Sequence, residues 1–210
     1  MDDTLKTFPT LYIHMLYALA HFLRDHCPFI WDLVDTLNSF LFSLRYGNKL
    51  KKIKGILTSV DSLYVISPIS ECRVSDLVAF FDAQPQEAFT YFHPHGFDEK
   101  SLKKLQGYRA FLAYAIKDDE KIIGYFFMRS FFHGKTFIGR IVDCNFRGKG
   151  IAKMMNRITF DIAQLIGLRV FQTISPKNVS SLRSAQAENE LRIIEILPNG
   201  DLYVENLPKK

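Results

Sequence analysis

The sequence has few cysteines and no long uncharged apolar run. Only three cysteines occur in 210 residues, Cys27, Cys72 and Cys144, and no two of them form a CxxC pair. A disulfide-stapled fold is therefore excluded, and we expect free thiols in a reducing compartment. No stretch reaches the roughly 18 consecutive apolar residues of a membrane-spanning helix, which argues against a transmembrane protein.

The sequence also lacks the signals of export, metal binding and nucleic-acid binding. The N-terminus, MDDTLKTF, has no basic region of the kind that opens a signal peptide. The six histidines show no HExxH or other zinc spacing, so we expect no metal. The net charge of +5 is mild, and no basic stripe interleaved with aromatic residues occurs, so we expect no nucleic-acid partner. These absences predict a cytoplasmic protein.

The residues that are present suffice for one sizeable core. Apolar residues make up 48% of the chain and charged residues 23%, which excludes disorder across its body. The hydrophobic pattern changes near residue 55. We therefore predict an N-terminal helical extension over residues 1–55 and a main domain over residues 56–210.

The extension is marked by residues 8–46, which are rich in Phe, Leu, Tyr and Ile. Apolar spacing after Pro28 predicts an amphipathic helix that begins at Pro28 and ends at Gly47. A basic stretch follows it. Two interpretations stay open: the apolar face packs on the main domain or on a second copy of the chain, or it lies with the basic stretch on the inner face of a membrane.

The main domain alternates helices with short strands. Turn signals between three successive strands predict an antiparallel meander, and Asn199-Gly200 predicts a later hairpin. Ser75 or its neighbour is expected to cap the first helix, and Gly167 to close the helix at 151–166. The expected strands are 63–66, 110–116, 122–132, 136–142, 170–174, 191–197 and 202–204, and the expected helices are 75–81, 98–105, 151–166 and 179–188.

A strand, a glycine-rich turn and a helix at residues 136–166 form the most informative segment. Gly148 and Gly150 allow a tight turn and close approach of a ligand. The backbone amides that follow lie unpaired at the start of a helix, which suits a phosphate or pyrophosphate. The turn is neither a Walker loop nor a dinucleotide fingerprint, because the further glycines and the lysine of those motifs are absent.

These residues resemble motif A of the GNAT acetyltransferases. The likeness rests on Ile141-Val142-Asp143-Cys144-Asn145-Phe146-Arg147-Gly148-Lys149-Gly150-Ile151-Ala152, with support from Ser175-Pro176-Lys177-Asn178 downstream and from the order of elements over roughly residues 62–205. It implies an α+β fold: a mixed, mostly antiparallel central sheet flanked by helices, here with an extra N-terminal helical segment. A fainter likeness, in the segments 38–47 and 93–97, is to bacterial acetyltransferases associated with surface polysaccharides.

The resemblance also implies where acetyl-CoA, as co-substrate, would bind. The end of the motif A strand would offer backbone groups to the pantetheine arm, with an amide near Val142 polarising the thioester carbonyl. Asn178 would contact the same arm and also cap its helix, and Ser181 would reach the phosphate end. The implied cofactor-binding residues are Ile141, Val142, Cys144, Arg147, Gly148, Lys149, Gly150, Ile151, Ala152, Asn178 and Ser181.

The catalytic groups are less strongly indicated. Many family members protonate the leaving thiolate with a Tyr seven residues after the Asn, but Ala185 stands there, so water or a tyrosine such as Tyr203 would have to serve. The candidate bases for the amine are His93, His95, Asp143 and Glu195. Each also has a purely structural interpretation.

The resulting prediction is an N-acetyltransferase that acts directly on a primary amine of a small molecule, an amino sugar being one such acceptor. Two alternatives stay open. One is a protein or peptide amine as acceptor. The other is a non-catalytic acyl-CoA-binding or membrane-associated scaffold, which Ala185 would favour.

Overall fold

The computed structural model describes residues 28–60 and 63–209, which belong to two compact units divided between Asn38 and Ser39. Within these ranges no helix is both long and apolar enough to cross a bilayer. Most of the predicted apolar segment 8–46 lies outside the described residues. The proposed boundary at residue 55, and the contact of this segment with a membrane or a second subunit, stay predictions.

Helix α2 spans Pro28–Leu50 and begins at the predicted proline. The prediction that it ends at Gly47 is wrong: Gly47 keeps a helical conformation, and the chain turns only after Leu50. In the larger unit Phe42 and Tyr46 are buried, whereas Phe40 and Leu44 are exposed. This difference fits the amphipathic pattern, because the two pairs lie on different faces of the helix.

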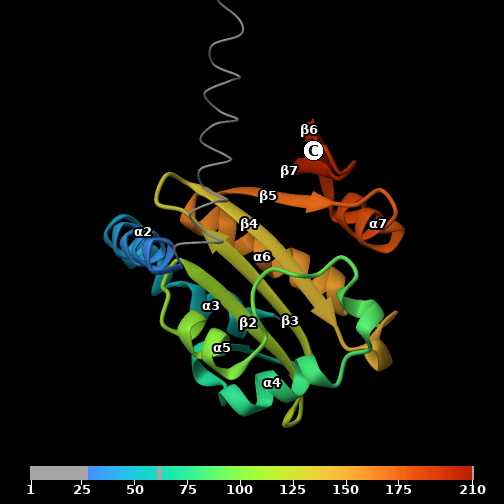
Figure 1. The fold of residues 1–210 in the computed structure, drawn as a ribbon, viewed down its shortest axis with the longest axis horizontal. Helices are drawn as coiled ribbons and strands as arrows, with labels where there is room; N and C mark the ends of the chain where they lie inside the picture. The colour runs from blue at the N-terminus through green and yellow to red at the C-terminus, as the bar shows by residue number, and fades with distance from the viewer. Residues whose placement is uncertain (1–27, 61–62, 210) are drawn as a thin grey trace, which may run out of the picture. The chain divides into compact units, whose positions relative to one another are not determined.

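Seven strands of the larger unit form one sheet in the order β1-β2-β3-β4-β5-β7-β6 (Figure 1). Strands β4 and β5 run parallel, and the other neighbouring pairs of this sheet are antiparallel. This confirms the predicted mixed sheet, its meander and its late hairpin. The strands are β1 (Val65–Pro68), β2 (Phe111–Asp118), β3 (Lys121–Ser130), β4 (Lys135–Val142), β5 (Arg169–Ile174), β6 (Asn189–Ile196) and β7 (Leu202–Pro208).

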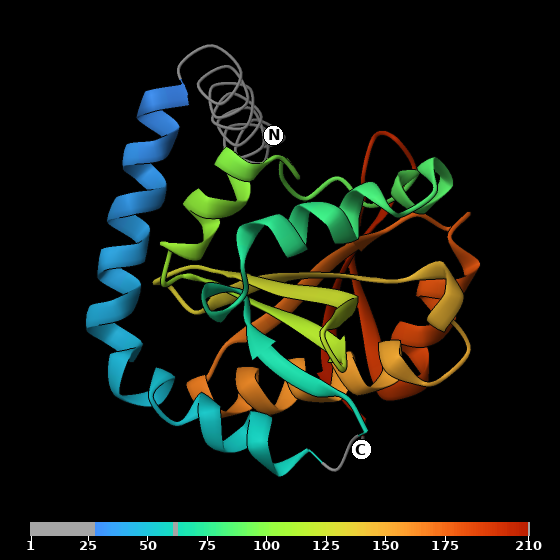
Figure 2. The ribbon, with the colours of Figure 1, turned by 90° about the horizontal axis from the view of Figure 1, so that it is seen from below.

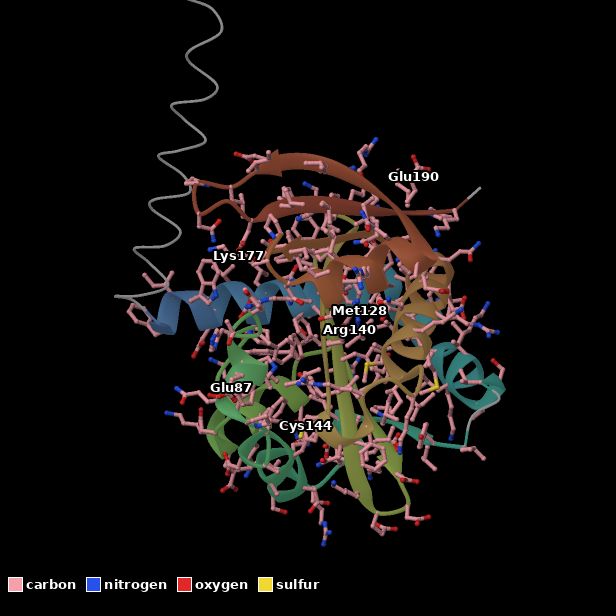
Figure 3. All side chains as sticks on the ribbon, turned by 90° about the vertical axis from the view of Figure 1, so that its right-hand side faces the viewer. Glu87, Met128, Arg140, Cys144, Lys177 and Glu190 are labelled. Atoms are coloured by element: carbon pink, nitrogen blue, oxygen red, sulfur yellow. The ribbon has the colours of Figure 1, made fainter. Side chains whose placement is uncertain are left out.

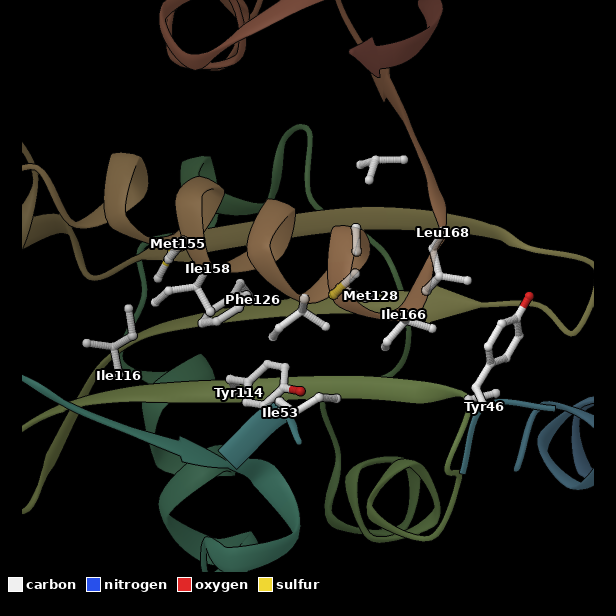
Figure 4. Packing of buried hydrophobic residues seen from close by; sticks show 14 of the residues in the cluster. Tyr46, Ile53, Tyr114, Ile116, Phe126, Met128, Met155, Ile158, Ile166 and Leu168 are labelled. Carbon is white, nitrogen blue, oxygen red and sulfur yellow. The ribbon is translucent and has the colours of Figure 1, made fainter. Parts of the chain in front are cut away.

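Helices cover both faces of the meander, and Figure 2 shows the sheet between them. One face carries α3 (Ile53–Ser59) and α6 (Ile151–Ile166), which pack with Phe126 and Met128 of β3 (Figure 4). The other face carries α4 (Val74–Asp82) and α5 (Glu99–Gln106), packed on Tyr125 and Phe127. Successive side chains of β3 point to opposite faces of the sheet, so they pack alternately into two separate hydrophobic cores.

The helix ends follow local chemistry. Asp98 caps α5 by accepting from the Ser101 amide, and Gly167 ends α6 at φ 86°, as predicted. The predicted cap at Ser75 or its neighbour is wrong, since α4 starts at Val74 after Arg73 and has no side-chain cap. Helix α7 spans Val179–Glu188, and the short 3₁₀ turns are η1 (Ile69–Glu71), η2 (Gln86–Phe89) and η3 (Cys144–Phe146).

Candidate active site

The sheet opens between its two parallel strands. β4 and β5 pair only over Lys135–Phe137 and Arg169–Phe171, at the N-terminal end of both strands. Beyond Phe137 they separate, and a cavity of about 1080 Å³ lies along the opened part of β4 and the start of α6. Strand β5, helix α7 and the loop at 87–94 complete its wall.

The opened edge of β4 presents unpaired backbone donors. The amide of Asp143 donates to the Ile123 carbonyl of β3. Because successive amides of a strand point to opposite edges, those of Ile138, Arg140 and Val142 point toward the gap. Such a row of donors can hold an extended ligand, and it includes the amide of Val142 that the family resemblance implies.

A second set of donors lies where α6 begins. Gly148 and Gly150 have φ of 78° and 79°, which only glycine adopts readily, and a Cβ at either would meet nothing within 4 Å. Among the residues described, the amides of residues 148–152 donate to no backbone acceptor outside α6. The positive end of the 16-residue helix and the Lys149 ammonium, 4.5 Å from the Phe146 ring centre, make this end attractive to an anion.

Asn178 and Ser181 lie on the cavity wall opposite β4. The Asn178 side-chain oxygen accepts from the Ser181 amide at 3.1 Å and so caps α7. Its amide nitrogen makes no hydrogen bond among the residues described. Asn178 can therefore cap the helix and donate to a ligand at the same time.

Among the sequence-predicted bases, His95 lies under the aromatic wall instead of on the cavity surface. Its Nδ1 lies 2.8 Å from the Gly96 carbonyl, which can only accept, and its Nε2 lies 2.9 Å from the Tyr125 hydroxyl. Nδ1 therefore carries the proton, and Nε2 accepts from Tyr125. Burial lowers the pKa of His95 to about 4. A histidine with both ring nitrogens engaged is poorly placed to take a proton from a substrate.

Asp143 and Glu195 are not part of the cavity wall either. Asp143 is buried, accepts from the Asn145 amide at 2.9 Å and pairs with Lys121 at 3.0 Å. Burial alone would raise the pKa of Asp143, but these two donors outweigh it and lower the pKa. Glu195 is exposed on β6. Neither carboxylate therefore faces the cavity in which an amine would bind.

His93 does line the cavity, on the loop above the β3–β4 face. Glu87 of η2 lines it as well, and Figure 3 labels this residue with Cys144 and Arg140. Sequence reasoning missed Glu87, because nothing local marks a carboxylate on a short 3₁₀ turn as part of a distant strand's cavity. His93 and Glu87 thus bring an imidazole and a carboxylate to the same part of the cavity wall as Tyr91 and Phe92.

Sequence reasoning also missed Arg140, in the middle of β4. Its guanidinium Nη2 donates to the Ser184 hydroxyl of α7 at 3.2 Å, across the open gap. The same hydroxyl accepts from Asn156 of α6 at 3.4 Å. An arginine in the interior of a strand was the available signal, because a charge is not expected there without a partner or a ligand.

Tyr203, the predicted substitute for the missing tyrosine, lies elsewhere. Its ring stacks on Phe137 and Phe171, and it is not part of the cavity wall. Burial raises the pKa of Tyr203. Ala185 is buried inside a small cluster with Ile174 and Val204. In the part of the chain that the structure describes, no three His, Cys, Asp or Glu side chains gather as metal ligands would.

A sheet split between two parallel strands, with unpaired amides along one strand and at the next helix start, can hold an extended ligand with an anionic end, as an acyl-CoA is. The family model "Acetyltransferase (GNAT) family" matches residues 77–187, more than half of the 210 residues. The chain belongs to this family and is an acetyltransferase, and its family uses acetyl-CoA. No curated protein matches the chain in sequence.

Solved structures of GNAT proteins share the fold. The GNAT domain of S. lividans PAT is 14% identical with a TM-score of 0.58, covering 68% of this chain and 89% of that one. A spermidine N-acetyltransferase SpeG chimera from Vibrio cholerae and hSSAT is 16% identical with a TM-score of 0.53, covering 70% and 96%. Mycobacterium smegmatis RimJ in complex with CoA-disulfide is 18% identical with a TM-score of 0.52, covering 69% and 81%.

Proposed function

We propose that this protein transfers the acetyl group of acetyl-CoA directly to a primary amine of a small molecule in the cytoplasm. One observation carries the proposal. The unpaired amides of β4 and those at the start of α6 face one continuous cavity, although nine residues separate Ile138 from Gly148. Such a cavity can hold a long molecule that is amide-bearing at one end and anionic at the other.

The donors match the two parts of such a molecule. The amides from Arg147 to Ala152 would hold the pyrophosphate, and the rim charges of Arg147 and Lys149 would add to their effect. The open edge of β4 would pair with the pantetheine arm. Asn178, through its free amide nitrogen, would bind the same arm, and Ser181 lies close by for the phosphate end. When bound, acetyl-CoA supplies a thioester that is reactive toward amines.

The chain's own contribution is to orient the thioester and to receive the amine. The Val142 amide would donate to the thioester oxygen and stabilise the charge that develops there. His93 would take the proton from the incoming amine, because it lines the cavity and histidine is the side chain that most often serves as a general base. Glu87 is the second candidate. We do not assign this role to His95 or Asp143, whose contacts are structural, nor to Glu195, which is exposed on β6 outside the cavity wall.

The acceptor side of the cavity favours a small molecule. Gly139 faces it, and a Cβ there would lie only 2.5 Å from the Phe127 ring and 3.4 Å from Phe92. Tyr91, Phe92 and Phe127 thus form an aromatic wall close to β4. Aromatic rings bind sugar faces and aliphatic amines well. Together with the faint likeness to polysaccharide-associated enzymes, this makes an amino sugar the first acceptor to test.

The first test is calorimetric titration with acetyl-CoA, CoA and ATP. We expect acetyl-CoA and CoA to bind far more tightly than ATP. The double variant Gly148→Val, Gly150→Val should weaken binding at least about tenfold, because it displaces amides that donate to charged oxygens. Gly134→Val is the matched control: its φ of 94° creates similar backbone strain in the β3–β4 turn, away from the cavity wall.

Absence of binding by any CoA species would reject the assignment of the cavity. Binding without thiol release across a panel of amines would instead favour the scaffold alternative that Ala185 suggests. Acetylation of peptides but not of small amines would support the protein-acceptor alternative. The panel should include amino sugars, polyamines and peptide N-termini.

A further inference from the structure

The guanidinium of Arg140 has no anionic partner. Its recorded hydrogen bond is to the neutral Ser184 hydroxyl, and no carboxylate among residues 28–60 and 63–209 forms an ion pair with it. The side chain is largely enclosed and keeps some surface toward the cavity. Loss of water around it lowers the pKa of Arg140 to about 10, which still leaves it charged at neutral pH.

An uncompensated charge in such a place is costly unless an anion joins it. Two ionised arginines elsewhere show the contrast: Arg169 and Arg192 both pair with Glu205. Arg140, unlike these two arginines, has no carboxylate beside it within the described part of the chain. Because it lines the cavity, the missing anion can come from a bound molecule.

The register of β4 fixes where that anion would lie. Arg140 pairs with Phe126, so its side chain projects from the α6 face of the sheet, and it reaches Ser184 on α7 across the open gap. Its own amide and that of Val142 face the same gap. The guanidinium thus stands beside the stretch of strand assigned to the thioester, and its Ser184 partner directly precedes Ala185 in α7.

We propose that Arg140 stabilises the thiolate that leaves during acetyl transfer, in place of the tyrosine that position 185 lacks. This inference rests on the proposed acetyl-CoA site. Arg140 would be a catalytic residue through direct contact with the sulfur. Ser184 would be a positioning residue because its hydroxyl accepts from the guanidinium, and Asn156 would act through Ser184, to which its amide donates.

The step balances without any additional reactant. The amine nitrogen forms a bond to the thioester carbon, the carbon–sulfur bond breaks, and its electron pair stays on sulfur. The proton lost by nitrogen goes to the base on the cavity wall or to water. Arg140 keeps its protons and stabilises the sulfur anion by charge and hydrogen bonding, because a guanidinium is a weaker acid than a thiol.

Other charges in the cavity bear on the same sulfur. From α6, Lys153 is paired with Glu188 of α7 at 3.3 Å. Arg147 lies at the α6 turn, Glu87 and His93 on the facing loop, and Asp201 at the β6–β7 turn. Unlike these groups, Arg140 stands on β4 beside the amides assigned to the thioester. Its removal should therefore change the pKa of the CoA thiol more than removal of any of them.

The experiment measures the pKa of the CoA thiol in the complex, which needs no knowledge of the acceptor. Full-length protein is saturated with CoA, and the ultraviolet absorbance of the thiolate is followed from about pH 6 to about pH 10. The absorbance of the same protein without CoA is subtracted at each pH. In the wild-type protein the thiolate should appear about 1–3 pH units lower than in free CoA. Arg140→Met should remove this shift, and Arg140→Lys should restore part of it.

Arg147→Met is the control, because it should weaken CoA binding and leave the thiol pKa of the saturated complex depressed. If CoA binds the wild-type protein and its thiol titrates as in solution, the role of Arg140 is wrong and the cavity assignment survives. If CoA does not bind, the proposed function itself fails. If Arg140→Met does not fold, the thiol pKa of bound CoA is compared between the wild-type protein, Arg140→Lys and Ser184→Ala. The same thiol pKa in all three proteins would overturn the inference.

Discussion

Asn178 offers a way to separate helix capping from ligand binding at a single side chain. Its oxygen caps α7 through the Ser181 amide, and under the proposed function its nitrogen would donate to acetyl-CoA. Asn178→Ala removes both roles. Asn178→Ser keeps a capping oxygen, because serine is an equally good N-cap, but it lacks the amide donor at that reach.

The magnitudes follow from these two contacts. Loss of the cap should cost about 0.5–2 kcal/mol, which lowers the melting temperature of a chain this long by roughly 2–4 °C for each kcal/mol. Loss of one neutral hydrogen bond to the ligand should cost about 0.5–1.5 kcal/mol, or about 2- to 12-fold in Kd. Asn178→Ala should show both effects and Asn178→Ser only the second.

Two assays decide the matter: urea unfolding of the free protein, and calorimetric titration with CoA. Asn178→Asp is a further control, because it retains the cap and replaces the donor by an acceptor. If Asn178→Ser is as stable as the wild-type protein and also binds CoA equally well, Asn178 is a helix cap and nothing more, and its assignment to the pantetheine arm is refuted.

Two further predictions concern stability. His95 has a folded-state pKa near 4, below its ordinary value of 6.5, so the unfolded chain takes up the proton first and stability should fall as the pH drops from about 6.5 to about 4. Unfolding of the wild-type protein in urea across this range should show that loss, and His95→Gln should show less of it; parallel curves would disprove the neutral buried form. Ile158 of α6 is fully buried in the larger core. Ile158→Ala should cost about 2–5 kcal/mol, and a cost below 1 kcal/mol in urea unfolding would contradict the packing.

The fold could largely be predicted because its signals are local. The 16 residues of α6, its closing Gly167 and the hairpin at Gly200 each depend on residues close in sequence. The two errors are also local. Ser75 and Gly47 have the chemistry of helix ends, but packing of Phe42, Tyr46 and Leu77 decides where these helices run.

The backbone donors of the candidate site could be predicted from the sequence, but most of its side chains could not, and the reason is physical. The amide donors at 147–152 come from one continuous turn, so a motif identifies them. The side chains that meet them come from several strands and a distant loop, and only register brings them together. His93 and His95 illustrate this: the two are alike in sequence, yet one faces the cavity and the other is held between Gly96 and Tyr125.

The short pairing between β4 and β5 has a consequence for the molecule as a whole. Past three residue pairs the sheet has two inner edges, each with backbone groups that lack a neighbouring strand. Such edges invite pairing with any extended chain, and proteins usually cover them. A bound molecule that lies along β4 would act as a partial extra strand there. The substrate would thus protect the sheet from unwanted pairing while it is held for reaction, so that ligand binding and resistance to aggregation depend on the same row of amides.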